Sequence, residues 1–275
     1  MWLAGNSGPF KLHELEVKSN TAKGLKILHV SDLHFAPGQT AKADFLSELA
    51  KTKPDLVINT GDNLGHEHAI NPALKALEPL MEIPGVFVNG SNDYRAPKPR
   101  NPLKYFQGPS QVSSAPNLDT GRFTGELEGA GWLNLNNQAG QLKVRGHSVG
   151  FLGLDDPHEN LDKIESLDSQ NKKIDGVDLK IGVAHAPYLR VIDAFVEKGA
   201  DLMLAGHTHG GQICLPGQEA LVTNCDLPTK YASGLSAWGT EGNQSLLHVS
   251  NGLGCSIYAP VRLFCPPSAT LITLR

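Results

Sequence analysis

The sequence predicts an α/β fold in which helices pack against a mostly parallel sheet and a second sheet layer lies beside it. Three strand–polar loop–helix units follow one another along residues 25–94, and such alternation is typical of a parallel sheet. Further along, short apolar runs separated by turn residues predict a β-meander, which supplies the second sheet layer. A chain of 275 residues is long enough for one sizeable α/β domain or at most two small ones, and we expect residues 1–275 to form a single domain.

The first part of the chain supplies three strands and two helices of the predicted sheet. Leu25–Ser31, Asp55–Thr60 and Gly85–Asn89 are short apolar runs, as expected for buried strands. Ala43–Leu49 has the apolar spacing of a helix, and Ala73–Met81 is predicted as the second helix. In open sheets of this kind, ligands bind beyond the carboxyl ends of the strands. The residues that follow each strand are therefore candidate site residues.

A proline-rich stretch at about residues 95–116 interrupts this pattern. It contains five prolines and few apolar residues, so we expect an exposed excursion over the site face. Both a lid or substrate loop and a plain surface loop are compatible with this composition.

The second part of the chain supplies the meander and the remaining strands. A short helix is predicted over Gly125–Ala130, and a longer one over Tyr188–Glu197. The predicted strands are Trp132–Leu135, Gln141–Val144, Ser148–Leu154, Leu179–Ala184, Asp201–Ala205, Leu246–Ser250 and Ala269–Leu274. A Gly- and Pro-rich loop, Asn251–Pro267, holds Tyr258 and Arg262, which we expect either to face the substrate or to have a structural role.

The composition excludes several classes of protein. A hydrophobic fraction of 40% and a charged fraction of 19% are those of an ordinary globular chain. The net charge of -4 means that the chain has no excess of basic residues for binding nucleic acid. The four cysteines form no Cys-x-x-Cys pair, which argues against a zinc knuckle, and we expect reduced, mostly buried thiols rather than disulfides. The N-terminal residues lack the apolar core of a signal peptide, so we expect a cytoplasmic protein, with peripheral contact to a membrane still compatible.

Acidic, amide and imidazole side chains follow five of the predicted strands. A single such residue is usually a cap or a loop residue, but five clusters on the ligand edge of one sheet indicate a site. They are Asp32 with His34, Asp62, Asn92 with Asp93, His185, and the pair His207 and His209 in a Gly-His-Thr-His-Gly-Gly sequence.

This set of side chains has the chemistry of a transition-metal site. Carboxylates and imidazoles without thiolates suit Mn, Fe or Zn, and imidazole is the commonest side-chain metal ligand. The set is too large for one ion. It fits two ions about 3.5–4 Å apart that share a carboxylate, with Mn the first expectation and Fe or Zn the alternatives.

The order and spacing of these motifs resemble the calcineurin-like metallophosphoesterases. The Val-Ser-Asp-Leu-His stretch ending at His34 and the Gly206–Ile213 stretch look most like the bacterial branch that includes the YkuE-like phosphoesterases. The resemblance implies a four-layer α/β/β/α sandwich with two mixed sheets. It also implies that one metal is held by Asp32, His34 and His209, and the other by His185 and His207, with Asp62 bridging the two.

The third motif departs from the family pattern. Where the family has Gly-Asn-His-Asp, this chain has Gly-Ser-Asn-Asp, so Ser91 replaces the metal-binding Asn and Asn92 replaces the catalytic His. An asparagine carbonyl can bind a hard or borderline cation, so we expect Asn92 to bind the second metal. Ser91 is the alternative ligand, and it is also a candidate for contact with the substrate. Asp93 is expected to orient a ligand or Asn92. The histidines that could replace the missing one are His29, His66, His68, His158 and His248.

The resemblance implies metal-dependent hydrolysis of a phosphate ester, with a phosphodiester as the first expectation and a metal-bound hydroxide as the nucleophile. The substrate would be a phosphorylated small molecule or a lipid-linked phosphate. One alternative is a pyrophosphohydrolase of a nucleotide-sugar or lipid diphosphate, whose acidic leaving group needs no general acid. An alternative of another class is a metal-binding module without catalysis.

Overall fold

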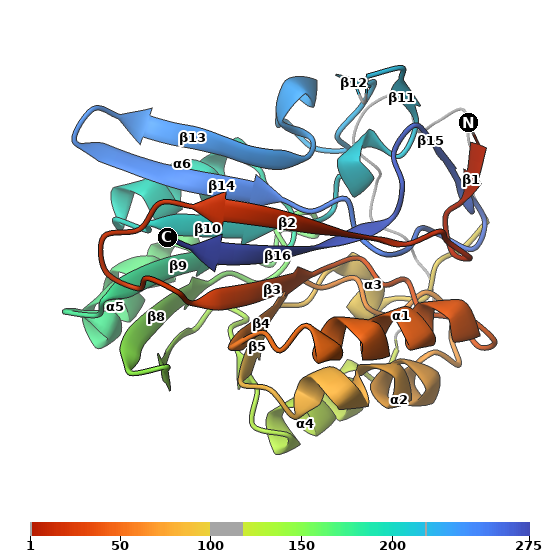
Figure 1. Ribbon diagram of the computed structural model, residues 1–275, viewed down its shortest axis with the longest axis horizontal. Helices are drawn as coiled ribbons and strands as arrows, with labels where there is room; N and C mark the ends of the chain where they lie inside the picture. Colours follow the sequence, from red (N-terminus) through yellow and green to blue (C-terminus); the bar gives the residue numbers. More distant parts are fainter. Residues whose placement is uncertain (1, 100–117, 218) are drawn as a thin grey trace.

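Two six-stranded sheets pack face to face in the computed structural model, which describes residues 2–99, 118–217 and 219–275 (Figure 1). The first sheet consists, in spatial order, of β2 (Lys11–Val17), β16 (Ser268–Leu274), β3 (Lys26–Val30), β4 (Leu56–Asn59), β5 (Gly85–Phe87) and β6 (Leu133–Asn134). The second consists of β13 (Gly234–Thr240), β14 (Asn243–Val249), β10 (Leu202–Ala205), β9 (Leu179–Val183), β8 (His147–Gly153) and β7 (Ala139–Val144). Both sheets mix parallel and antiparallel pairs, as the family resemblance implied.

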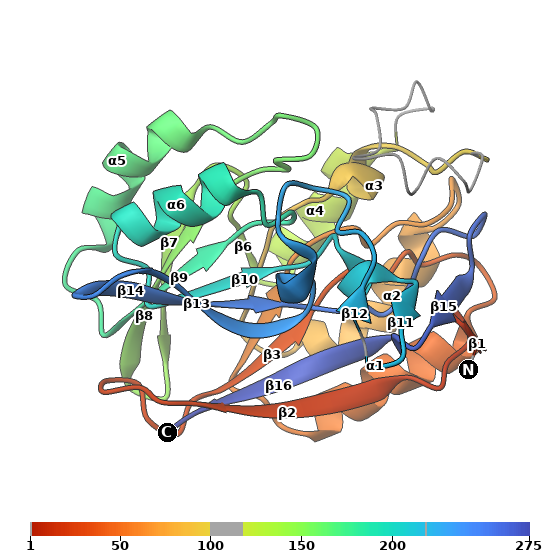
Figure 2. The same cartoon turned by 90° about the horizontal axis from the view of Figure 1, so that it is seen from above.

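Helices cover the outer face of each sheet and complete the four layers (Figure 2). On the first sheet lie α1 (Thr40–Lys51), α2 (Ile70–Met81) and α4 (Thr120–Gly129). On the second lie α5 (Leu167–Asn171) and α6 (Leu189–Glu197). The α/β/β/α sandwich is therefore confirmed.

Alternation along the strands explains why the layers stack in this order. On β3, Ile27 is buried between the two sheets, whereas its neighbour Leu28 is buried under the helices. On β4, Ile58 is likewise buried between the two sheets and Val57 under the helices. A strand that is apolar on both faces needs cover on both faces, which is why these runs lack alternating polar residues.

Shorter elements surround the sandwich. The segment β1 (Trp2–Ala4) pairs with β15 (Val261–Leu263), and β11 (Cys214–Leu215) pairs with β12 (Glu219–Ala220). A four-residue helix, α3 (Ser91–Tyr94), follows β5. Single 3-10 turns occur at Ile164–Ser166, Lys172–Ile174, His209–Gly211 and Thr229–Tyr231.

The structure corrects three predictions about the sheets. The expected meander is split, because β6 pairs with β5 in the first sheet while β7 and β8 form a hairpin in the second. The strands β2 and β13 were not predicted, because they are largely solvated edge strands that lack a run of buried apolar residues. The strands that precede the polar clusters belong to both sheets, not to one, since β3, β4 and β5 lie in the first and β9 and β10 in the second.

Several smaller predictions can also be compared with the structure. The helix predicted over residues 125–130 begins earlier, at Thr120, because the Asp119 carboxylate accepts a hydrogen bond from the Arg122 backbone and caps it. Residues 100–116 of the proline-rich excursion lie outside the described residues. All four cysteines are free, and Cys214, Cys255 and Cys265 are buried. Within the described ranges, no helix is both long and apolar enough to cross a membrane.

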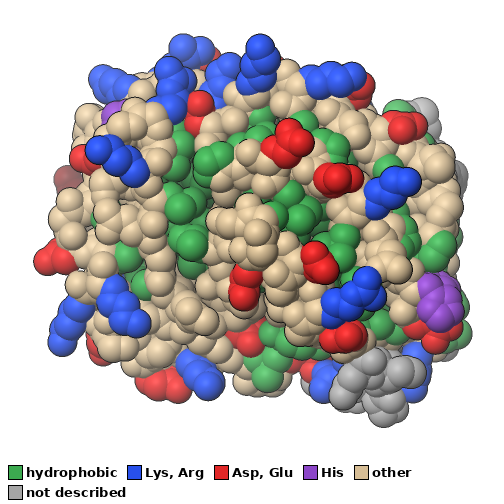
Figure 3. All heavy atoms as spheres, turned by 90° about the horizontal axis from the view of Figure 1, so that it is seen from below, with side chains coloured by type: hydrophobic (Ala, Val, Ile, Leu, Met, Phe, Trp, Pro, Cys, Tyr) green, Lys and Arg blue, Asp and Glu red, His purple; other side chains and the backbone are tan. Residues whose placement is uncertain are grey.

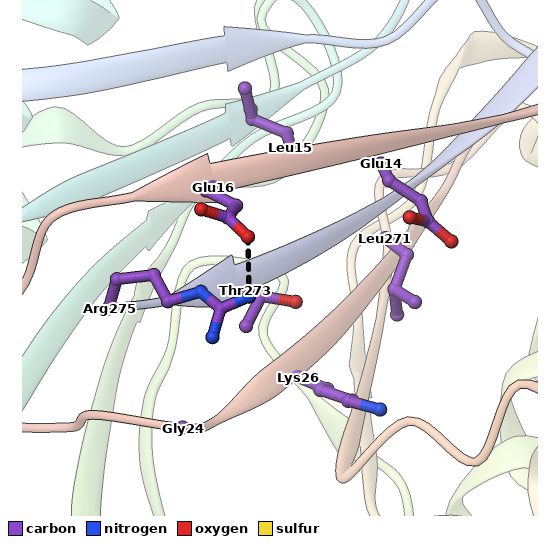
Figure 4. A pocket seen from close by; sticks show the side chains of 8 residues that line it. All are labelled: Glu14, Leu15, Glu16, Gly24, Lys26, Leu271, Thr273 and Arg275. Atoms are coloured by element: carbon purple, nitrogen blue, oxygen red, sulfur yellow. Dashed lines mark hydrogen bonds and ion pairs between the residues drawn. The ribbon is translucent and has the colours of Figure 1, made fainter.

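The surface of the described residues includes a hollow that the candidate metal ligands do not line. Acidic and basic side chains are interspersed over the face shown in Figure 3. A hollow of about 310 Å³ lies over β2, β16 and β3, where the Glu16 carboxylate and the Arg275 guanidinium pair across it (Figure 4). The candidate metal ligands are not among the residues that line this hollow.

Candidate metal centre

Acidic and histidine side chains from both sheets meet in two overlapping groups. Ligand atoms of Asp32, His34 and His209 all lie within 4.8 Å of one another, and so do those of Asp32, Asp62 and His185. Oδ2 of Asp62 lies 3.4 Å from Nε2 of His34 and 3.5 Å from Nε2 of His185. The two carboxylates therefore join the two groups, which is the arrangement that a pair of ions with a shared carboxylate requires.

Most of these residues have a backbone conformation that non-glycine residues seldom adopt. A positive φ places the side chain on a sharp bend, at a cost of order 1–3 kcal/mol per residue that the surrounding structure must offset. Five expected ligands share it: Asp32 (φ 49°), His34 (39°), Asp62 (54°), His207 (70°) and His209 (52°). These bends aim side chains from separate strand ends at one place.

Two glycines allow the loops to approach closely. A Cβ on Gly90 would lie 2.3 Å from Oδ1 of Asp62 and 2.8 Å from the His185 ring. A Cβ on Gly206 would lie 2.4 Å from Oδ2 of Asp32. Any larger residue at either position would displace a carboxylate of the site.

Two histidines of the site each direct Nδ1 at a backbone carbonyl and Nε2 at the other candidate ligands. Nδ1 of His185 donates a hydrogen bond to the Thr60 carbonyl at 2.7 Å, and its Nε2 is buried without a hydrogen-bond partner. Nδ1 of His209 lies 3.0 Å from the Gly254 carbonyl oxygen and 3.1 Å from the Arg262 guanidinium, and its Nε2 lies 3.3 Å from Nε2 of His34. A buried ring nitrogen without a hydrogen-bond partner is costly, and a divalent cation can take the place of the proton that Asp62 favours on the His185 ring. The residues present thus fit a divalent metal ion.

His207 is placed beside this centre but lies outside both groups of ligand atoms. Its ring centroid is 5.2 Å from that of His185, and its Nε2 faces the Asn224 carbonyl at 3.1 Å. Its backbone N–H donates to both oxygens of Asp32, each at 3.1 Å. Nδ1 is the nitrogen left for a metal, and the role of His207 as a ligand stays a prediction.

Burial and mutual charge set the protonation of the site. Burial lowers the pKa of His34 to about 4 and raises the pKa of Asp32 to about 6. Burial also opposes the charged forms of Asp62 and His185, but each stabilises the charge of the other. Their attraction outweighs burial, so the pKa of Asp62 falls well below its ordinary value and the pKa of His185 rises well above it.

The altered third motif places Asn92, rather than Ser91, at the centre. Nδ2 of Asn92 donates to Oδ2 of Asp62 at 2.7 Å, and its backbone N–H donates to Oδ1 at 2.8 Å. Ser91 is half-buried, and its hydroxyl oxygen lies 3.5 Å from the Asn92 amide. The role of the Asn92 carbonyl oxygen as a metal ligand stays a prediction.

Asp93 fixes the loop that carries Asp62. Its carboxylate is fully buried and accepts hydrogen bonds from the backbone N–H groups of Asp62 and Asn63, each at 2.8 Å, and of Gly90 at 3.0 Å. Burial, with a contribution from Asp62, raises the pKa of Asp93 to about 7. Asp93 therefore holds a metal-ligand loop in place, as expected from its position in the motif.

The two residues predicted to face substrate differ in placement. The Tyr258 side chain is 48% exposed, and its substrate contact stays a prediction. Arg262 is fully buried, and its guanidinium donates to the carbonyl oxygens of His209 and Gly254. The expectation that Arg262 faces substrate is therefore wrong, because its donors are directed at the backbone behind His209.

Of two further features of the site, the first escaped the sequence analysis and the second is a histidine that it named as a possible replacement. Lys42 is fully buried on α1 and donates to the carbonyl of Leu33, between the two ligands of the first motif. His158, in the loop after β8, has its ring centroid 4.6 Å from that of His207. The second had a detectable signal, because the Asp-Asp-Pro-His stretch also follows a buried strand. The first had none, because a lysine in an amphipathic helix normally faces solvent.

Comparison with known proteins identifies relatives over nearly the whole chain. A family model described as calcineurin-like phosphoesterase matches residues 25–211, which include every expected metal ligand. The phosphodiesterase YaeI of Escherichia coli (strain K12) is 27% identical over 271 residues, which cover 95% of this chain and 86% of YaeI. The uncharacterized metallophosphoesterase YkuE of Bacillus subtilis (strain 168) is 26% identical over 283 residues, covering 96% and 86%.

A solved structure supports the fold. The 5'-nucleotidase precursor from Thermus thermophilus superposes with a TM-score of 0.50 at 15% identity. The match covers 83% of this chain and 49% of that chain, so this protein spans about half the length of that structure.

Proposed function

The chain belongs to the calcineurin-like phosphoesterase family, and from this membership we propose that it hydrolyses a phosphate ester, preferably a diester, with two divalent metal ions. The placement of Asp62 carries the proposal, because its Oδ2 atom lies within 3.5 Å of histidine nitrogens from both ligand groups. The preference for a diester is supported by the similarity to the phosphodiesterase YaeI, which extends over most of this chain and most of YaeI. The substrate class is a phosphorylated small molecule or a lipid-linked phosphate.

The proposed ligand sets follow the two groups. Asp32, His34 and His209 hold one ion, His185, His207 and Asn92 hold the other, and Asp62 lies between them. When bound, such ions supply Lewis-acid polarisation of the phosphate and lower the pKa of a water molecule. Mn is the proposed metal, with Fe or Zn as alternatives, because the donors are carboxylate, amide and imidazole groups.

The chain's own residues prepare the site for this chemistry. Asp93 fixes the backbone of the Asp62 loop, and Arg262 fixes the backbone of His209. The Asn92 amide holds Oδ2 of Asp62 at 2.7 Å. Each contact removes a motion that would otherwise have to be frozen when substrate binds.

The altered third motif supports a second candidate reaction. With Asn92 where the family pattern has histidine, a leaving group that needs no proton is favoured. A phosphoanhydride has such a leaving group, so a pyrophosphohydrolase of a nucleotide-sugar or lipid diphosphate is the alternative. Product analysis separates the two, because a diphosphate cleaved at its anhydride yields two monophosphates.

The decisive experiment compares wild type with Asp62→Ala, using Mn²⁺-loaded protein and bis(p-nitrophenyl) phosphate. We expect turnover by wild type and a loss of about 1000-fold or more in the variant, since the shared carboxylate serves both ion positions. Asp44→Ala is the matched control, because Asp44 is exposed on α1. Metal content is measured for each protein.

Two outcomes would contradict the proposal. Full turnover by Asp62→Ala would show that hydrolysis does not use this centre. Two bound ions in wild type, without turnover of any monoester, diester or diphosphate, would instead indicate a metal-binding module without catalysis.

A further inference from the structure

We propose that His158 contacts the phosphate group of the substrate and replaces the histidine that the family pattern has at the position of Asn92. The inference rests on the proposed function and assigns a substrate contact to a loop outside the recognised motifs. The replacement comes from the loop after β8, in the second sheet, whereas the altered motif follows β5 in the first sheet.

The other histidines named as replacements are placed elsewhere. His29 and His248 are buried between the two sheets, with their Nδ1 atoms 2.9 Å apart. His66 and His68 contact each other just before α2, with ring centroids 5.4 Å apart. Neither pair is directed at the ligand groups by these contacts.

His158 extends a row of histidine rings that begins inside the metal centre. The His185 and His207 ring centroids are 5.2 Å apart, and those of His207 and His158 are 4.6 Å apart. Along this row the first two rings are buried, whereas His158 is only half-buried. It therefore lies at the rim, next to the proposed second ion and within reach of a ligand entering from solvent.

The loop that carries His158 is attached to the altered motif on both sides of the histidine. Before it, Oδ1 of Asp155 accepts a hydrogen bond from the Tyr94 hydroxyl at 2.6 Å. After it, the Glu159 carboxylate pairs with the Arg95 guanidinium. Tyr94 ends α3 and Arg95 follows it directly. The loop with the extra histidine and the motif without one thus form a single unit.

The His158 ring is also held in orientation. Nδ1 of His158 lies 3.0 Å from the Tyr188 hydroxyl, and its backbone N–H donates to Oδ1 of Asp156 at 3.0 Å. The Arg190 guanidinium donates to the Pro157 carbonyl at 2.8 Å and stacks 4.7 Å from the centre of the Tyr188 ring. A histidine that these contacts hold in orientation binds an anion without first losing rotational freedom.

The test measures phosphate affinity on Mn²⁺-loaded protein, with inorganic phosphate as the probe. We expect His158→Ala to bind phosphate about 10- to 100-fold more weakly, as for the loss of a hydrogen bond to a charged group, while retaining the metal content of wild type. His158→Gln keeps an N–H donor and should recover part of the affinity. His66→Ala is the matched control and should bind phosphate as wild type does.

A second readout uses turnover of bis(p-nitrophenyl) phosphate, where His158→Ala should lose at least 10-fold in kcat/KM. Unchanged phosphate affinity in His158→Ala would overturn the inference. A second result would also overturn it: His158→Ala loses metal, and excess Mn²⁺ restores its phosphate affinity. His158 would then act only by supporting His207. If wild type binds phosphate but hydrolyses no ester, the proposed function fails while the affinity comparison still decides the role of His158.

Discussion

Nε2 of His34 and Nε2 of His209 lie 3.3 Å apart, although 175 positions separate the two residues in the chain. Burial lowers the pKa of both rings, so both are neutral near pH 7. Nδ1 of His209 lies 3.0 Å from the Gly254 carbonyl oxygen and 3.1 Å from the Arg262 guanidinium, whereas its Nε2 faces His34. Neutral imidazole is the form that binds a metal ion, so the fold brings together two ring nitrogens that can share one cation.

Metal binding should therefore stabilise the folded protein. Adding Mn²⁺ at about 100 times its dissociation constant to chelator-treated protein should add about 2.7 kcal/mol to the free energy of unfolding. For a chain of this size, this corresponds to a rise in Tm of about 5–10 °C. Calorimetry measures the shift, and His209→Ala should show a smaller one. If the Tm of the wild-type protein does not change when Mn²⁺ is added, the proposed metal centre is contradicted.

Asp93→Asn should weaken both the fold and the site. The two carboxylate oxygens accept N–H groups on both sides, from Asp62 and Gly90 on one oxygen and from Asn63 on the other. An amide nitrogen cannot accept, so buried donors are left unpaired at a cost of about 1–3 kcal/mol in unfolding free energy. Metal affinity should fall about 10- to 100-fold.

Urea unfolding and metal titration measure these two losses. Asp44→Asn is the control, because that side chain is exposed on α1 and should change neither quantity. Wild-type metal affinity in Asp93→Asn would mean that the loop keeps its shape without the carboxylate.

Gly90→Ala should reduce metal affinity and turnover without unfolding the protein. The added methyl group would meet Oδ1 of Asp62 at 2.3 Å, so the carboxylate must move. Gly125→Ala is the matched control, since a Cβ there meets nothing within 4 Å and replaces glycine inside α4. That control should instead gain about 0.5–1 kcal/mol from helix propensity. Equal metal affinity in the two variants would contradict the close approach at Gly90.

Acid should destabilise the protein partly through His248. Burial lowers the pKa of this histidine from 6.5 to about 4. Between these values the unfolded chain binds a proton that the folded chain does not, so stability falls as the pH falls. From pH 7.5 to 5.5 the contribution of His248 is about 1 kcal/mol. His248→Asn should show a correspondingly smaller loss in urea unfolding at the two pH values.

His68→Asn provides the comparison for this pH effect, because it makes the same substitution at an exposed histidine. Identical pH slopes for wild type and His248→Asn would show that the buried histidine pair is not protonated on unfolding in this range.

The sequence predicted the inner strands and the residues at their ends because these strands are apolar on both faces. The prediction for Leu25–Ser31 matches β3 within a residue at each end, and the ligands Asp32 and His34 follow it directly. Sheet membership was not predictable in the same way. A strand such as β6 has only two residues, and its partner is decided by long-range packing that periodicity does not record.

The supporting residues of the site were less accessible to sequence reasoning than the ligands. Arg262 lies 53 positions beyond His209, yet its guanidinium holds the carbonyl of that histidine. Lys42 is a helix residue that ordinary amphipathic patterning would place in solvent. Both roles depend on the tertiary placement of backbone carbonyls, which have no sequence signature.

The position of β16 has a consequence for folding during synthesis. This strand, residues 268–274, lies between β2 on one side and β3 on the other. Until it has left the ribosome, β2 has no hydrogen-bonded neighbour in its sheet, and the β3 edge beside it is open. The metal-ligand loops can all be synthesised while the first sheet is still in two parts. A nascent chain thus carries an uncovered strand edge, the feature that favours aggregation, until its C-terminal strand inserts and joins the parts into one sheet.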